Sequence, residues 1–352
     1  MPRFSLTATT LILTAASCCF SIPAYAEEQS FTDLPKDHIA YEAVEYLKTN
    51  HIITGYPDGT FRPDSQVNRA EALKLIIGPL VKEAELSKAK SVKSSFTDVP
   101  EDAWFKPYVE IARTSAIIEG PPAKQIFKAD SPVLKAEFMK MVEQAFGSDP
   151  KTAFSEIRLP LSKDVKNPDD WFYPYIRYGI TSSMTMAAAD GSLSPTKPLT
   201  RSEISLLLYR YIMYTQGRRN QALLSEAQNE IVIILQQLGA NNIVEAEYAS
   251  ARALLATRGA NVSKPDDPLV QGSVKVAEAF RSILRAYRSS EAKNFDQMIQ
   301  LSGDAWNLGS RARTLSPELS GIADQIQSIA KDMADGARAK KLQQGSSASS
   351  KQ

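Results

Sequence analysis

The 352-residue sequence is poor in cysteine and histidine, the side chains that most often bind transition metals. It holds two cysteines, Cys18 and Cys19, and two histidines, His38 and His51. Both cysteines precede Ala26, after which the chain is expected to be cleaved, so the mature protein would lack disulfides, thiolate metal sites and cysteine nucleophiles. Two histidines are too few for most histidine-rich metal sites, and no nucleophile-elbow, phosphate-loop or dinucleotide-binding motif is present. We therefore expect no cofactor, no metal and no enzymatic activity.

The chain also lacks an excess of charge of either sign. Lys and Arg total 41 and Asp and Glu total 40, so no strongly basic face is expected, which argues against a nucleic-acid partner. Hydrophobic residues make up 43% and charged residues 23%, as in ordinary globular proteins. After Ala26, no apolar run is long enough for a membrane helix.

The segment from Met1 to Ala26 is typical of a secretory signal peptide. Arg3 is the only charge before Glu27, residues 6–20 are apolar or small, and an Ala-Tyr-Ala sequence ends at Ala26. This pattern predicts cleavage after Ala26 and a secreted protein of the cell surface or cell envelope. A lipid anchor on Cys18 is the alternative, although the residues before it form a poor lipoprotein motif.

A 66-residue repeat organises the front half of the chain. A Phe-Thr-Asp opening at 31–33 recurs at 96–98, and a weaker copy lies at 161–165. Segments of four residues begin at Asn68, Leu134 and Thr200, at equal intervals, and share a basic second and an acidic fourth position. The residues eight positions before each basic residue have the same spacing. Regular spacing at several points indicates stacked repeat units.

Each unit is predicted to be a helix, a long loop and a second helix. In the first unit, residues 39–47 have apolar positions near helical spacing, and a loop rich in Gly, Pro and Asp spans residues 55–59. One helix pair cannot bury its apolar face alone, whereas three stacked pairs can. The expected units are 27–80, 96–147 and 148–216, with a partly helical connector at 81–95.

The four-residue segments also contain helix-capping signals. Asn68 with Glu71, and Thr200 with Glu203, fit the capping box, in which the first side chain and the glutamate each bond a backbone N–H. Leu134 has no side-chain acceptor. For the second unit we therefore predict a helix that starts at Ser131 and Pro132.

The basic residue of each segment needs a separate explanation. Arg69, Lys135 and Arg201 fall in the first turn of a helix, where the helix dipole disfavours a cation by roughly 0.3–1 kcal/mol. A bound anion would resolve this conflict, because free N–H groups at a helix start also favour an anion. Alternatively, each cation pairs with a nearby aspartate or lies in solvent.

Two tryptophans occupy matching places in the second and third units. Trp104 lies six residues after Asp98, and Trp171 lies seven residues after Asp164. They either pack in the core or present a ring that stacks on a sugar face.

Together these motifs resemble the surface-layer homology (SLH) repeat. The first unit carries Gly-Tyr-Pro-Asp-Gly-Thr-Phe-Arg-Pro at 55–63 and Asn-Arg-Ala-Glu at 68–71, and the resemblance covers residues 31–214. It implies a pseudo-threefold helical module that holds a protein non-covalently on the cell surface. The implied ligand is an anionic wall polysaccharide, often bearing ketal-linked pyruvate, or peptidoglycan, bound in grooves between repeats. The candidate glycan-binding residues are Arg69, Lys135, Arg201, Trp104, Trp171, Asp33, Asp98, Asp164 and Gly55.

The sequence departs from that family pattern in each unit. His38 and Ile39 stand where the first repeat usually has Trp, residues 119–125 replace the usual glycine-rich loop, and residues 184–189 lack the usual Gly-Tyr. Lys135 stands where the family has Arg, and lysine lacks the planar fork that binds carboxylates in two places. These departures predict that one or two of the three grooves are inactive.

The back half has a different composition and is predicted to be wholly helical. Residues 217–341 are poor in Pro, with breaks expected near 239–242 and 264–268, and residues 342–352 are polar and are predicted to form a disordered tail. The expected fold is therefore all-α: the three-repeat module followed by an antiparallel helical bundle or a coiled-coil hairpin. We expect the bundle to present the protein at the envelope, or to bind another copy or a protein partner. The alternative is an envelope enzyme or glycan hydrolase that the repeats target.

Overall fold

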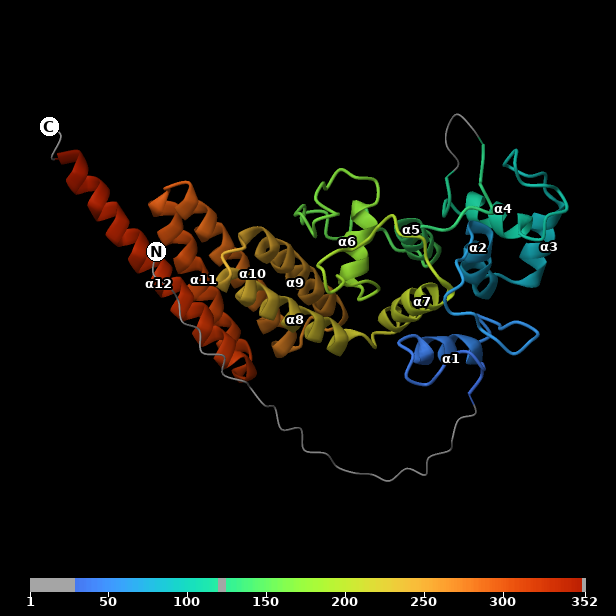
Figure 1. The fold of residues 1–352 in the computed structure, drawn as a ribbon, viewed down its shortest axis with the longest axis horizontal. Helices are drawn as coiled ribbons and strands as arrows, with labels where there is room; N and C mark the ends of the chain where they lie inside the picture. Colours follow the sequence, from blue (N-terminus) through green and yellow to red (C-terminus); the bar gives the residue numbers. More distant parts are fainter. Residues whose placement is uncertain (1–28, 120–124, 350–352) are drawn as a thin grey trace, which may run out of the picture.

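A computed structural model describes residues 29–119 and 125–349, and over these ranges the protein is all-helical, with no β-strand. The repeat module occupies one end of the molecule and a bundle of longer helices the other (Figure 1). The expected signal peptide, residues 1–26, lies outside the described residues. None of the helices in the described ranges combines the length and the apolar character needed to cross a membrane.

The three predicted units are each built as helix, loop and helix. A short helix follows the first unit, as expected for the connector, and a single 3-10 turn precedes it. The helices of the module are α1 (Tyr41–Thr49), α2 (Arg69–Ile77), η1 (Gly78–Leu80), α3 (Glu83–Ser91), α4 (Lys106–Thr114), α5 (Lys135–Ala145), α6 (Tyr173–Thr181) and α7 (Arg201–Thr215).

The units close into a ring with approximate threefold symmetry. Helix α2 packs on α4, α5 on α6, and α7 returns to α1. At the centre, three backbone hydrogen bonds form a cycle: the N–H of Val67 donates to the carbonyl of Leu199 (3.1 Å), that of Val133 to Val67 (2.9 Å), and that of Leu199 to Val133 (3.1 Å). These residues are separated by the interval of the sequence repeat, so the sequence repeat is also the repeat of the structure.

Two of the three predicted helix starts are confirmed. Asn68 and Thr200 cap α2 and α7, each in a reciprocal capping box with the glutamate three residues later. The predicted start of the second unit's helix at Pro132 is wrong, because α5 begins at Lys135 with Leu134 at the N-cap. Pro132 instead forms a short bridge with Asn68 of the first unit, and the Glu137 carboxylate alone accepts the Leu134 N–H (3.1 Å).

The back half is a stack of antiparallel helices, each packed on the next. The two predicted breaks are confirmed, and Asn241 in the first of them adopts a positive φ of 58°. Asp267 caps α10 ahead of Pro268 at the first helical position. The helices are α8 (Asn220–Gly239), α9 (Ile243–Ser263), α10 (Pro268–Glu291), α11 (Phe295–Leu315), η2 (Pro317–Leu319) and α12 (Ser320–Ser349).

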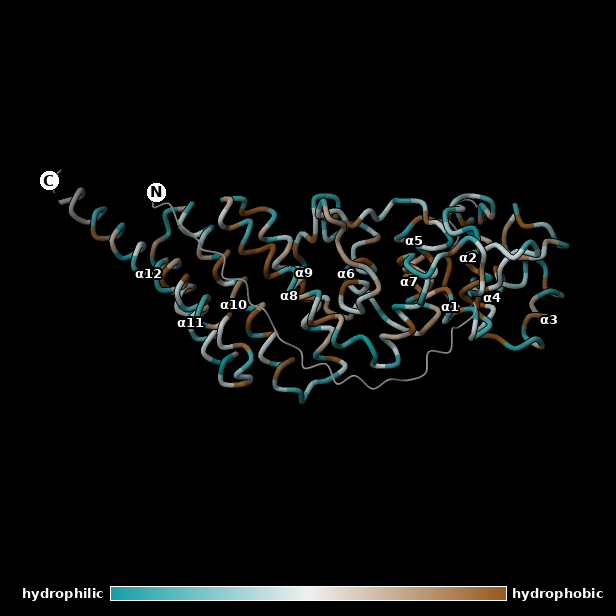
Figure 2. The backbone as a smooth tube through the Cα atoms, turned by 60° about the horizontal axis from the view of Figure 1, so that its bottom comes forward, coloured by the Kyte–Doolittle hydropathy of each residue, from teal (hydrophilic) through white to brown (hydrophobic). Residues whose placement is uncertain are grey.

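The disordered tail predicted for residues 342–352 is not observed where the structure describes that segment. Helix α12 continues to Ser349 and extends beyond its neighbouring helices in both views (Figures 1 and 2). The segment contains no proline, and Leu342, Gln343 and Gln344 favour helix, so the helix continues past Ala337, the last buried residue up to Gln344, in spite of Gly345 and the serines that follow.

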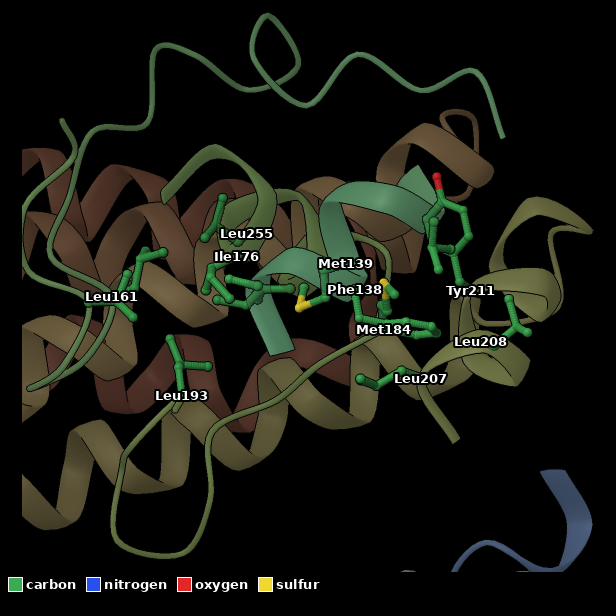
Figure 3. Close-up of a cluster of buried hydrophobic side chains, with 14 of the residues drawn as sticks. Phe138, Met139, Leu161, Ile176, Met184, Leu193, Leu207, Leu208, Tyr211 and Leu255 are labelled. Atoms are coloured by element: carbon green, nitrogen blue, oxygen red, sulfur yellow. The ribbon is translucent and has the colours of Figure 1, made fainter. Parts of the chain in front are cut away.

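The two halves share one hydrophobic core. Leu255 of α9 lies in the same cluster as Leu161 and Ile176 of the third unit (Figure 3). Helix α9 approaches α6 closely because Gly259 has no side chain: a Cβ there would lie 1.8 Å from the Thr181 carbonyl oxygen. The bundle is therefore joined to the module by direct packing.

Candidate binding grooves between the repeats

The three aspartates of the openings fix the loops of their own units. Asp33 accepts the backbone N–H groups of Phe61 and Arg62, both at 2.7 Å. Asp98 binds Phe127 and Lys128 in the same way, and Asp164 binds Leu193 and Ser194. Both oxygens of each carboxylate thus hold a loop backbone in place.

The three basic residues reach across to the loop of the next unit. The Arg69 Nε donates to the Phe127 carbonyl (3.0 Å), the Lys135 Nζ to the Leu193 carbonyl (2.7 Å), and the Arg201 Nε to the Phe61 carbonyl (2.7 Å). Each of these acceptor residues also donates its own backbone N–H to the aspartate of its unit. Each repeat junction is therefore held by one cation and one aspartate on the same loop.

The helix starts are not open anion sites, which corrects the expectation of free N–H groups. The N–H of Arg69 donates to the carbonyl of Ser131, that of Lys135 to Lys197, and that of Arg201 to Ser65. Carbonyls of the next unit thus satisfy these donors and also offset the unfavourable helix dipole near each cation. Any anion must be bound by the outward-facing parts of the cationic side chains.

A groove of about 430 Å³, hereafter the first groove, is lined by residues from all three units. Arg201 comes from the third unit, Lys74 from the first and Trp104 from the second. The Lys74 Nζ lies 5.6 Å from the centre of the Trp104 ring, and Trp104 is 53% exposed. Within the described residues neither cation forms an ion pair with a carboxylate. The remaining lining residues include His51, Thr54, Gly55, Tyr56, Phe61, Glu71, Tyr108 and Ser205.

The loop of the first unit orients Arg201. The Arg201 guanidinium lies 4.9 Å from the Tyr56 ring centre, and the Arg62 guanidinium lies 3.9 Å from the same ring. A further hydrogen bond joins the Arg201 Nη2 to the Thr54 carbonyl (3.1 Å). The ring contact and the two hydrogen bonds to backbone carbonyls together hold the Arg201 guanidinium in one orientation.

A smaller groove of about 120 Å³, the second groove, lies at the next junction. Arg69, Lys140 and Trp171 take the places that Arg201, Lys74 and Trp104 have in the first groove. Trp171 is 54% exposed, so for both tryptophans the interpretation as core residues is wrong. The remaining lining residues are Ile117, Ile118, Glu119, Glu137 and Met141.

The third junction has lost two of these features. Leu206 stands five residues after Arg201, where the other units have Lys74 and Lys140, and Ile39 stands one residue before the N-cap of α1, where they have Trp. Burial lowers the pKa of Lys135 to about 8. The mouth of this junction also meets the bundle, because Arg219 and Glu226 both hydrogen-bond to Ser183 of the third loop.

Lys74 and Lys140 are groove residues that the sequence interpretation missed. They share the interval of the repeat, which was visible, but lysine on the surface of a helix is common and carried no distinguishing signal. In the described ranges, no group of three or more His, Cys, Asp or Glu side chains is placed to hold a metal ion.

Gly55 is required by packing at the edge of the first groove. A Cβ at this position would lie 2.3 Å from Cε1 of Phe31 and 2.8 Å from the Thr60 carbonyl oxygen. We expect Gly55→Ala to lower the free energy of unfolding by about 1–2 kcal/mol, because the loop must move off Phe31. Gly78→Ala is the control in a chemical denaturation series, since a Cβ there meets only Tyr108 at 4.0 Å. Equal stability of the two variants would contradict this role.

Residues 30–73 and 95–139 match the S-layer homology domain. The two matched segments fall in the first two units of the ring. Both grooves include residues of these two segments, and Arg201 and Trp171 come from the third unit.

Several relatives of known name match part of the chain. A cellulosome-anchoring protein of Acetivibrio thermocellus is 29% identical over 121 residues, which span 34% of this chain and 27% of that protein. A surface-layer 125 kDa protein of Lysinibacillus sphaericus is 27% identical over 203 residues, 56% of this chain and 16% of its own length. An uncharacterized cell wall amidase of Bacillus anthracis is 32% identical over 139 residues, which span 38% of this chain and 24% of that protein. The chain thus spans well under a third of each of these relatives.

Proposed function

We propose that this protein is an exported cell-envelope protein that its repeat module anchors non-covalently to an anionic wall polysaccharide or to peptidoglycan. The third unit acts in this proposal as a third S-layer homology repeat, supported by its matching aspartate, junction hydrogen bonds and capping box. The names of relatives that share the repeats, a cellulosome-anchoring protein and a surface-layer protein among them, support a surface role.

The observation that carries the proposal is the pair of unneutralised cations beside an exposed indole in the first groove. Arg201 is held in one orientation, so its outward N–H groups can bind a carboxylate without a large loss of side-chain freedom. Lys74 adds a second positive charge, and Trp104 offers a flat apolar face of the kind that packs on a sugar ring.

Exchanging the charge of Lys74 tests this function without breaking an ion pair, because among the described residues its ammonium group lies 5.6 Å from the Trp104 ring centre and pairs with no carboxylate. We expect Lys74→Glu to lower the affinity of the mature protein for purified wall glycan about tenfold or more, because repulsion replaces attraction toward the anion. Co-sedimentation over a range of protein concentrations measures the effect. Lys88→Glu on α3 is the matched control, since Lys88 is exposed and lies outside the groove. The proposal fails if the two variants pellet alike, or if the unaltered protein does not pellet.

We further propose that the helical half presents or assembles the protein and does not catalyse a reaction. The repeats also occur in a protein named as a cell wall amidase, so the alternative is a targeted envelope enzyme. Incubation of the protein with purified wall glycan separates the two proposals. We expect no release of reducing ends or free amino groups over the buffer control, and release of either would favour the enzyme.

A further inference from the structure

The cations of the second groove are neutralised by the chain itself. The Arg69 Nη1 forms an ion pair with the Glu137 carboxylate (3.0 Å), and the Lys140 Nζ lies 3.7 Å from a Glu119 oxygen. In the first groove the only lining carboxylate is Glu71, which accepts the Asn68 N–H and forms no ion pair with a described residue. The first groove is thus lined by two cations and one carboxylate, and the second by two cations and two carboxylates.

This difference changes which ligand each groove can accept. An anion entering the second groove would meet two carboxylates and would have to displace them from Arg69 and Lys140, whereas the first groove presents its cations without competition. Uncharged hydroxyl groups face no such barrier, because they can donate hydrogen bonds to a carboxylate that remains in its ion pair. Glu119 is accessible for this purpose, with 60% of its side chain exposed.

The shape of the second groove is consistent with an uncharged sugar. Trp171 is half exposed, and its ring centre lies 6.4 Å from that of Tyr175, so an accessible indole stands beside a second aromatic ring. Ile117, Ile118 and Met141 supply an apolar wall. An aromatic face combined with carboxylate acceptors suits the apolar and hydroxyl-bearing surfaces of a sugar ring.

We propose that the second groove binds an uncharged sugar unit and discriminates against acidic ones, while the first groove binds the acidic unit. This inference rests on the proposed glycan anchoring and extends it, because the module would then bind two chemically different sugar units of the same envelope glycan, one in each groove.

The three tryptophans of the chain allow each groove to be observed separately. Trp104 reports on the first groove, Trp171 on the second, and Trp306 on α11 of the bundle is an internal control. The indole N–H signals of the ¹⁵N-labelled mature protein are followed during titration with a methyl N-acetylhexosaminide, and with the same glycoside carrying a ketal-linked pyruvate. We expect the acidic glycoside to bind at Trp104 at least about tenfold more tightly than at Trp171. The neutral glycoside should shift Trp171, and neither should shift Trp306.

A double variant tests whether the carboxylates cause the selectivity. We expect Glu119→Gln with Glu137→Gln to raise the affinity of the acidic glycoside at Trp171 about tenfold or more. The amide introduced by Glu137→Gln would still offer an oxygen to the Leu134 N–H, so α5 keeps its start. Any of three results would overturn the inference. The acidic glycoside could bind equally well at Trp104 and Trp171 in the unaltered protein, or the neutral glycoside could leave the Trp171 signal unchanged. The double variant could also bind the acidic glycoside at Trp171 no more tightly than the unaltered protein does. The proposed anchoring fails separately if the acidic glycoside leaves Trp104 unmoved.

Discussion

Replacing Arg252 by alanine is expected to lower the free energy of unfolding by about 3–5 kcal/mol. Arg252 lies on α9 with 3% of its side chain exposed and forms two hydrogen bonds to the Glu230 carboxylate, at 2.6 and 2.7 Å. It also donates to the Leu161 carbonyl of the third unit (2.8 Å). Its removal would leave Glu230, which is 13% exposed, as an unpaired charge beside the joint between module and bundle. Urea or guanidinium denaturation measures the loss.

Two controls separate the buried pair from a general effect of lost charge. The double variant Arg252→Met with Glu230→Met should recover most of the stability, because apolar side chains of similar volume need no ionic partner. Arg338→Ala breaks an exposed pair with Asp335 and should cost under about 1 kcal/mol. If Arg252→Ala costs no more than Arg338→Ala, the pair does not stabilise the joint.

Replacing Glu143 by methionine is expected to stabilise the protein, increasingly so as the pH rises. Glu143 lies on α5 fully buried, and neither carboxylate oxygen has a hydrogen-bond partner. Burial raises the pKa of Glu143 well above its ordinary value of 4.5. Because the folded-state pKa exceeds the unfolded one, the contribution of this group to stability is fully present below about pH 4.5 and is lost as pH rises through the folded-state pKa.

Denaturation at several pH values, compared between variants, measures the Glu143 effect. Glu143→Met should gain on the order of 3 kcal/mol at pH 8, because an unpaired buried polar or ionised group is removed at nearly constant volume. Glu143→Gln keeps the shape and polarity but cannot ionise. It should therefore lose the pH dependence while keeping part of the cost of an unpaired polar group. An unchanged pH dependence in both variants would show that Glu143 is not the titrating group.

The elements of the fold were predictable where the signal is local. The capping boxes at Asn68 and Thr200 depend on residues three apart, and the breaks near Asn241 and Pro268 depend on turn residues in the sequence itself. The prediction failed at Pro132, where the local signal of a proline at a helix start was overridden by pairing with the neighbouring unit.

The roles of the groove residues were harder to predict because they are set by ring closure. The Arg201 side chain acts on the loop at Phe61, 140 positions away along the chain. No local pattern reveals that its helix-start N–H is already bonded to Ser65, or that Lys74 comes to lie beside Trp104. The glycan-binding residues predicted from the sequence therefore included the cations and tryptophans of the grooves, but the sequence did not predict which residues these side chains contact.

The period of the repeat, the three helix–loop–helix units and the wholly helical back half follow from the amino-acid sequence, because periodicity, caps and turn residues act over a few positions. The differences between the junctions arise only from tertiary contacts: Glu137 and Glu119 neutralise the cations of the second groove, Arg201 and Lys74 have no carboxylate partner among the described residues, and the third junction meets the bundle through Ser183. Charge balance depends on distances of a few ångströms between residues far apart in the chain, and these distances exist only after the ring has closed.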